Sequence, residues 1–126
     1  MNILIADDNP EVRSALRLLL ELDHLPANVV EVSKMQDLLA YLNENCPALV
    51  LLDWELPGLE RSDIRTLLQA GCPQMKLIAL SSKYEAHQDA LAAGVDAFVS
   101  KTEPPEQILS TLHSLIQFPK ESDSFL

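Results

Sequence analysis

The sequence predicts an α/β protein built on a doubly wound parallel sheet of five strands. Five short apolar runs alternate with five segments of helical periodicity, and the connections between them are short. Residues 48–52 are apolar throughout, which is typical of a strand that helices cover on both faces. No two runs are joined by a two-residue hairpin signal, so the alternative of antiparallel pairing is not favoured. The crossover connections should be right-handed.

The strands are predicted from apolar runs that end at a polar residue or a turn former. They span residues 2–6, 27–32, 48–52, 76–80 and 97–100. The helices are predicted from apolar residues spaced three and four apart. They run from Pro10 to before Pro26, from after Ser33 to Asn45, from Arg61 to Ala70, from Tyr84 to Ala93, and from about Pro104 to Ile116.

Capping residues support the helix ends. Asn9 is the expected N-cap of the first helix, with Pro10 at its first position, and Ser33 is the expected N-cap of the second. Gly71 and Gly94 are the expected C-caps of the third and fourth. The fourth helix presents mainly alanines to the core, so we expect it to bury little apolar area.

Length and charge limit the classes of function. A chain of 126 residues, 48% of them hydrophobic, suits one domain, which we place at residues 1–117, with a polar tail or the start of a linker at 118–126. The net charge of −10 repels nucleic-acid phosphates and anionic membranes, so we expect no direct nucleic-acid binding by this chain. Because no signal peptide or membrane span is evident, we expect a cytoplasmic protein.

The two cysteines each precede a proline. Cys46 and Cys72 have no CxxC partner, which disfavours zinc and redox motifs, so we expect two reduced, structural thiols.

Polar side chains stand where four of the five predicted strands end. The residues are Asp7 and Asp8 after the first strand, Asp53 after the third, Ser81 after the fourth and Lys101 after the fifth. The second strand contributes none, which fits a sheet ordered 2-1-3-4-5 with the site at the switch point. Clustered carboxylates repel one another and need a cation, and an all-oxygen site suits Mg²⁺.

This set of groups predicts phosphoryl transfer to a carboxylate. Asp53 would attack and form an aspartyl-phosphate, while Asp7 and Asp8 hold the Mg²⁺. Lys101 and the Ser81 hydroxyl would neutralise the remaining phosphoryl oxygens. We include Glu55, two residues beyond Asp53, among the candidate metal ligands.

The same motifs resemble those of a known family. The acidic pair Asp7-Asp8, the stretch from Leu52 to Gly58 around Asp53, Leu80-Ser81 and Phe98-Val99-Ser100-Lys101 stand in the order and spacing of the receiver domain of bacterial two-component response regulators. The resemblance covers Asn2 to about Gln117 and implies the flavodoxin-like (βα)5 fold. Residues 94–108 are most similar to receivers of regulators that carry a helix-turn-helix effector.

The resemblance implies a signalling function rather than an enzyme. A sensor histidine kinase or a phosphotransfer protein would deliver the phosphoryl group to Asp53. Ser81 and Phe98 would then switch the face made by the fourth helix, the fifth strand and the fifth helix, and a phosphorylation-dependent homodimer is a candidate output.

Two alternatives stay open. A phosphorylation-independent pseudo-receiver would act only as an interaction module, but it would typically have lost Asp53, Ser81 or Lys101, which are all present. An Asp-nucleophile phosphatase needs a second acid, for which Glu55 has the right spacing, but the chain offers no cap domain to enclose a substrate.

We also predict a Glu55–Lys83 ion pair over the site.

Overall fold

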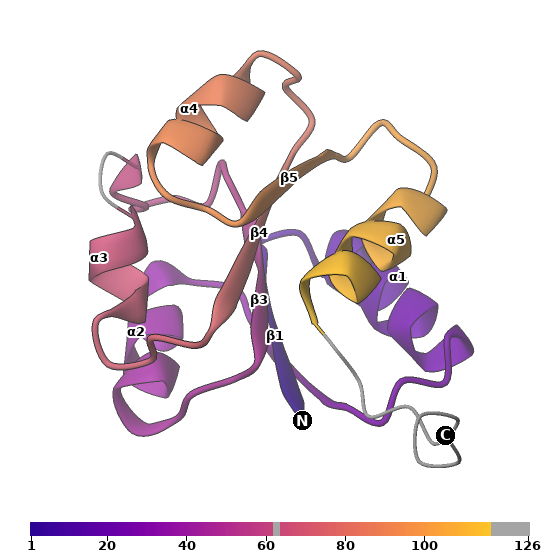
Figure 1. The fold of residues 1–126 in the computed structure, drawn as a ribbon, viewed down its shortest axis with the longest axis horizontal. Coiled ribbons are helices and arrows are strands. Elements are labelled where there is room, and N and C mark those ends of the chain that lie inside the picture. The colour runs from indigo at the N-terminus through magenta and orange to yellow at the C-terminus, as the bar shows by residue number, and fades with distance from the viewer. Residues whose placement is uncertain (62–63, 117–126) are drawn as a thin grey trace, which may run out of the picture.

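The computed structural model describes residues 1–61 and 64–116 and confirms the predicted architecture (Figure 1). Five parallel strands form one sheet in the order β2-β1-β3-β4-β5. The strands are β1 (Asn2–Ala6), β2 (Asn28–Val32), β3 (Leu49–Asp53), β4 (Lys76–Ser81) and β5 (Ala97–Ser100). The helices are α1 (Pro10–Leu22), α2 (Met35–Glu44), α3 (Ile64–Gln69), α4 (Ala86–Ala92) and α5 (Glu106–Leu115).

The helices cover both faces of the sheet. Figure 1 shows α1 and α5 on one side, with α2, α3 and α4 on the other. Side chains of β3 alternate between the two layers: Leu49 and Leu51 pack in the core with α1 and α5, whereas Val50 and Leu52 pack in the core with α2, α3 and α4. Every residue of β3 is buried, as the unbroken apolar run predicts.

The ends of several helices differ from the prediction. The side chain of Asn9 accepts a hydrogen bond from the Glu11 N–H and caps α1 as expected. The N-cap of α2 is Lys34 instead of Ser33, and it makes no capping bond through its side chain. Within the described residues α3 begins only at Ile64, and α4 begins at Ala86 because residues 84 and 85 form a turn. Gly94 follows α4 with φ of 103°, a conformation that glycine adopts without strain.

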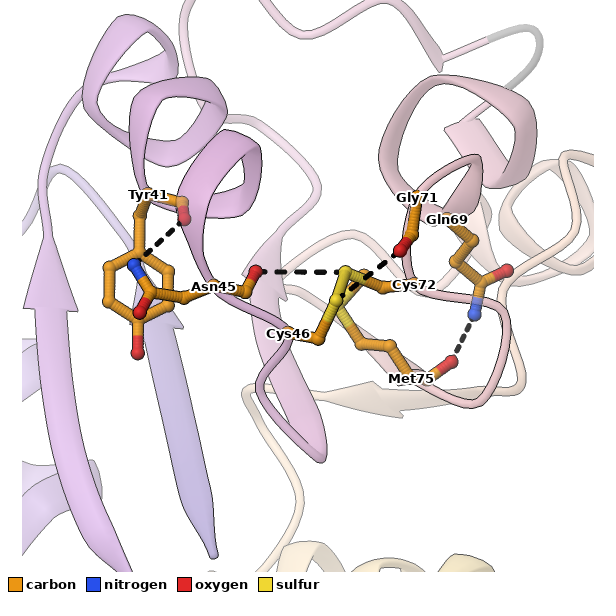
Figure 2. The surroundings of a disulfide bond; sticks show 7 residues. All are labelled: Tyr41, Asn45, Cys46, Gln69, Gly71, Cys72 and Met75. Carbon is orange, nitrogen blue, oxygen red and sulfur yellow. Dashed lines mark hydrogen bonds between the residues drawn. A yellow bond between two sulfur atoms is a disulfide. The ribbon is translucent and has the colours of Figure 1, made fainter.

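The prediction of two reduced thiols is wrong. Cys46 and Cys72 form a disulfide with their Cα atoms 5.4 Å apart (Figure 2). They precede the neighbouring strands β3 and β4, which pair with Leu49 opposite Lys76, so the sheet itself brings the two segments together.

The domain boundary and the membrane-span prediction concern the chain as a whole. The boundary at residue 117 and the tail at 118–126 lie outside the described residues. Within the described ranges, no helix combines the length and the apolar character that a membrane crossing requires.

Candidate functional site

The candidate site lies at the carboxyl edge of the sheet, where backbone hydrogen bonds continue the strand pairing by one residue. The N–H of Asp7 donates to Val32 O at 3.1 Å, and the N–H of Lys101 donates to Ser81 O at 2.8 Å. Asp53 is the last residue of β3, opposite Leu80 in β4. The residues predicted at four separate strand ends therefore stand side by side on one rigid edge, as open parallel sheets place their ligands.

A buried ion cluster forms the floor of the site. The Lys101 ammonium lies 2.9 Å from Asp7 Oδ2 and 3.2 Å from Asp53 Oδ1. Asp7 is 1% exposed and Asp53 is 3% exposed, so both carboxylates are almost fully removed from water. Backbone donors hold them in place: the Asn9 N–H donates to Asp7 Oδ1 and the Glu55 N–H donates to Asp53 Oδ1.

Three carboxylates converge at this edge of the sheet. Oxygens of Asp7, Asp8 and Asp53 all lie within 4.8 Å of one another, and Asp8 is exposed. Three negative charges face the single ammonium of Lys101, which leaves a net charge of about −2 for a divalent cation to neutralise. The donors are all oxygen, the ligand type that Mg²⁺ prefers, so the residues present fit a metal of this kind.

The pKa values of the site reflect burial opposed by pairing. Burial raises the pKa of Asp53, although the Glu55 N–H and the Lys101 charge oppose the increase. Burial acts to lower the pKa of Lys101, but the hydrogen bond to Asp7 and the charges of Asp53 and Asp7 outweigh it, so its pKa is raised. Lys101 is therefore a fixed positive charge, whereas burial disfavours the ionised form of Asp53.

The predicted Glu55–Lys83 ion pair does not form among the described residues. The Ser81 hydroxyl instead donates to the Glu55 carboxylate, at 2.9 Å from Oε1 and 2.8 Å from Oε2. Lys83 contacts the same hydroxyl through its backbone, since its N–H donates to Ser81 Oγ at 2.9 Å. Glu55 thus holds Ser81 and lies outside the group of three carboxylates, and its role as a metal ligand stays a prediction.

The predicted switch aromatic has a partner that sequence reasoning missed. Phe98, half-buried on β5, stacks on the His87 ring of α4 with centroids 4.8 Å apart and planes 13° apart. The ring centroid of Tyr84 lies 6.0 Å from that of the same imidazole, with the two planes 85° apart. The signal available in the sequence was the place of His87, one residue after the start of the helix that packs beside β5.

Fold and site together define a class: a flavodoxin-like parallel α/β domain with an acidic cluster and a lysine at the carboxyl edge of its sheet. Within that class, the chain belongs to the response regulator receiver domains, because the family model of that description matches residues 3–113.

Known relatives agree with this assignment. The transcriptional activator protein ExaE of Pseudomonas putida is 31% identical over 120 residues, covering 92% of this chain and 55% of ExaE. Response regulator UvrY of Escherichia coli K12 is 28% identical over 118 residues, covering 91% of this chain and 54% of UvrY. This chain thus spans about half the length of these curated relatives. The resemblance to the receiver family predicted from the motifs is confirmed.

A solved structure shows the same fold. RcsB from Salmonella enterica serovar Typhimurium, described as bound to the promoter rprA in the presence of the phosphomimetic BeF3⁻, has a TM-score of 0.77 and 26% identity. The match covers 98% of this chain and 72% of that one.

Proposed function

We propose that this chain is a phosphoacceptor receiver that takes a phosphoryl group onto Asp53. The observation that carries the proposal is the placement of the Asp53 carboxylate, buried at the sheet edge, 3.2 Å from the Lys101 ammonium and beside the carboxylates of Asp7 and Asp8. A carboxylate can attack phosphorus when the charge on the transferring oxygens is neutralised as it develops. The family to which the chain belongs supports the same reaction class.

The roles of the residues follow from their places. An Asp53 oxygen forms the bond to phosphorus, and the bond to the donor's leaving group breaks. The Lys101 ammonium, anchored by Asp7, attracts the oxygens of the incoming group. Asp7, Asp8 and Asp53 would hold Mg²⁺, which when bound supplies the additional positive charge that phosphoryl transfer requires.

The proposed partner is a sensor histidine kinase or a phosphotransfer protein, which implies a cytoplasmic location. Among the relatives, ExaE is named a transcriptional activator and RcsB was solved on a promoter, which supports a transcriptional output. The strongly acidic chain would not contact DNA by itself, and a phosphorylation-dependent homodimer is the proposed route to output.

Chemical phosphorylation tests the acceptor. Incubation with acetyl phosphate and Mg²⁺ should add one phosphoryl group to the chain, measured as intact mass. Asp53→Asn should gain none, and Asp23→Asn, a change at an aspartate in the turn after α1, should behave like the parent. An adduct of equal yield on Asp53→Asn would refute the assignment.

Mg²⁺ binding can be tested separately. The chain has a single tryptophan, Trp54, which is 3% exposed and adjacent to Asp53, so its fluorescence should respond when a cation enters the site. We expect Asp8→Ala to lose most of the response, because it removes one of the three carboxylates. If Asp8→Ala titrates like the parent, Asp8 is not a ligand.

The switch would begin with an exchange of partners by Ser81. Its hydroxyl donates to Glu55 in this structure, so it must leave that carboxylate to reach a phosphoryl oxygen. We expect Phe98 to rotate inward as Ser81 moves and α4 to shift, since the residues that α4 buries are small alanines. Beryllofluoride should therefore lower amide protection across α4, and Ser81→Ala should abolish the change. Unaltered protection in the parent would exclude this coupling.

A further inference from the structure

The Cys46–Cys72 bridge lies at the amino edge of the sheet, opposite the acidic cluster. Cys46 stands between the end of α2 and the start of β3, and Cys72 between the end of α3 and the start of β4. Just beyond the bridge, the N–H of Lys76 donates to Ala48 O at 3.0 Å, which is where the pairing of the two strands begins. The bridge therefore joins the chain just before β3 and β4, the two strands that end in Asp53 and Ser81. The loop that it closes, residues 46–72, includes Asp53.

The two cysteines differ in access to solvent. Cys46 is exposed, whereas Cys72 is 3% exposed. A depression in the surface at the bridge is lined by both cysteines together with Pro47, Pro73 and Lys76. A small thiol or disulfide can therefore reach Cys46 from solvent, while Cys72 is shielded by its surroundings. Exposure is one of the factors that decide which of two sulfurs exchanges.

The surroundings also suit the reduced pair. Cys46 Sγ lies 3.3 Å from Gly71 O, and Cys72 Sγ lies 3.6 Å from Asn45 O, so each sulfur faces a carbonyl of the segment that carries the other cysteine (Figure 2). A disulfide sulfur has no hydrogen to donate, but a thiol does. After reduction, each thiol would have a carbonyl oxygen in place to accept its hydrogen bond. Opening the bond would therefore not leave a buried thiol without a hydrogen-bond partner.

We propose that Cys46 and Cys72 form a reversible thiol–disulfide pair, in which Cys46 exchanges with low-molecular-weight thiols and disulfides of the glutathione class and Cys72 resolves the mixed disulfide. In the cytoplasm such thiols keep most cysteine pairs reduced, so the bridge would report a shift in the redox poise there. The compartment in this argument rests on the proposed function. The exchange chemistry does not, and can be tested without any phosphorylation.

The reaction balances as two exchange steps. The Cys46 thiolate attacks one sulfur of oxidised glutathione, forms a mixed disulfide and releases one glutathione thiolate. The Cys72 thiolate then attacks the Cys46 sulfur and releases the second. The protein gives up two electrons and two protons, which the glutathione disulfide takes up as two glutathione molecules. Reduction runs the same steps in reverse, with attack at Cys46.

Intact-mass measurement on reduced chains tests the assigned roles. After incubation with oxidised glutathione, the parent should return to the internal disulfide with no glutathione attached. Cys72→Ser, and Cys72→Ala as a second variant should the serine disturb folding, should retain one glutathione on Cys46. Cys46→Ser should retain none in its folded state. Equal capture by the two single variants, or a parent that stays a dithiol, would overturn the proposal.

The parent chain offers an independent measurement that needs no substitution. When the reduced protein is treated briefly with iodoacetamide, Cys46 should be alkylated at least about tenfold faster than Cys72, because a buried thiol reacts only when its surroundings open. Peptide mass analysis separates the two sites. Equal rates in the folded protein would show that neither cysteine is the preferred point of exchange.

Discussion

Reduction of the Cys46–Cys72 bridge should lower the free energy of unfolding of the domain. The only covalent change is the replacement of the S–S bond by two S–H groups. The two cysteines are 26 residues apart in sequence, so the bond closes a loop that the reduced unfolded chain does not have. The chain-entropy relation for a loop of that length gives about 3.5 kcal/mol at 25 °C. In a domain of 126 residues this corresponds to a fall in melting temperature of roughly 13 °C, with an unfolding entropy of ~0.26 kcal/mol/K.

Thermal unfolding followed by circular dichroism, with and without a reductant, measures this difference. The free energy of unfolding from urea titration gives a second value, and the urea dependence should be steeper for the reduced chain because its unfolded state is less compact. A Cys46→Ala, Cys72→Ala double variant is the matched control and should not respond to the reductant. Equal melting temperatures for the oxidised and reduced parent would refute the reasoning, because they would show that the bond does not constrain the unfolded chain.

Three further predictions concern single side chains. Gly94→Ala should cost about 1–3 kcal/mol in urea unfolding, because φ is 103° and the new Cβ would lie 2.7 Å from Arg65 Cβ, whereas Gly71→Ala, with no atom within 4 Å, should be near neutral. Asp53→Asn should be more stable than the metal-free parent at neutral pH, because burial raises the pKa of Asp53 above its ordinary 3.8. The folded parent therefore loses stability as the pH rises from 3.8 through the raised pKa. A difference in unfolding free energy between variant and parent that does not widen over this interval would contradict the prediction. Glu31→Gln should cost about 0.5–1 kcal/mol of unfolding free energy, since the partly exposed carboxylate pairs with two arginines of α1. Hydrogen bonds and charges from these arginines lower the pKa of Glu31, so the cost should be full above pH 4.5 and fade as the pH falls through the lowered pKa. A cost that stays constant across that range would exclude ion pairing as its source.

The fold was predictable because its signals are local and repeated. An unbroken apolar run such as 48–52 indicates a strand that is covered by helices on both faces. Four strands end in a polar residue and one does not, which indicated the order of the sheet. The cluster of Asp7, Asp53 and Lys101 followed from that order alone. The helix ends were less predictable: Ser33 has a side chain suited to capping α2, yet the helix begins one residue later, with Lys34 at the N-cap and no capping bond from its side chain.

The sequence did not predict the hydrogen-bond partner of Ser81 or the disulfide. Nothing in the spacing indicates that the Ser81 hydroxyl turns to Glu55, because the choice depends on the side-chain rotamers of the last residue of β4 and of a residue in the loop after β3. The sequence does carry a signal for the disulfide: each Cys-Pro pair stands before a strand, and the predicted order makes those two strands neighbours. Spacing rules for metal and redox motifs do not register such a pair, since they count residues along the chain.

The stack of His87 on Phe98 offers a spectroscopic test of the proposed switch. A phenyl ring lying almost parallel to an imidazole, with centroids 4.8 Å apart, shifts the magnetic resonance of the imidazole protons through its ring current. Rotation of Phe98 away from His87 would remove that shift. The proton spectrum of the unlabelled chain, in which only His24, His87 and His113 contribute imidazole signals, could therefore follow the two states on one resolved line. Populations of the minor state could be measured in this way while the phosphoryl donor is titrated.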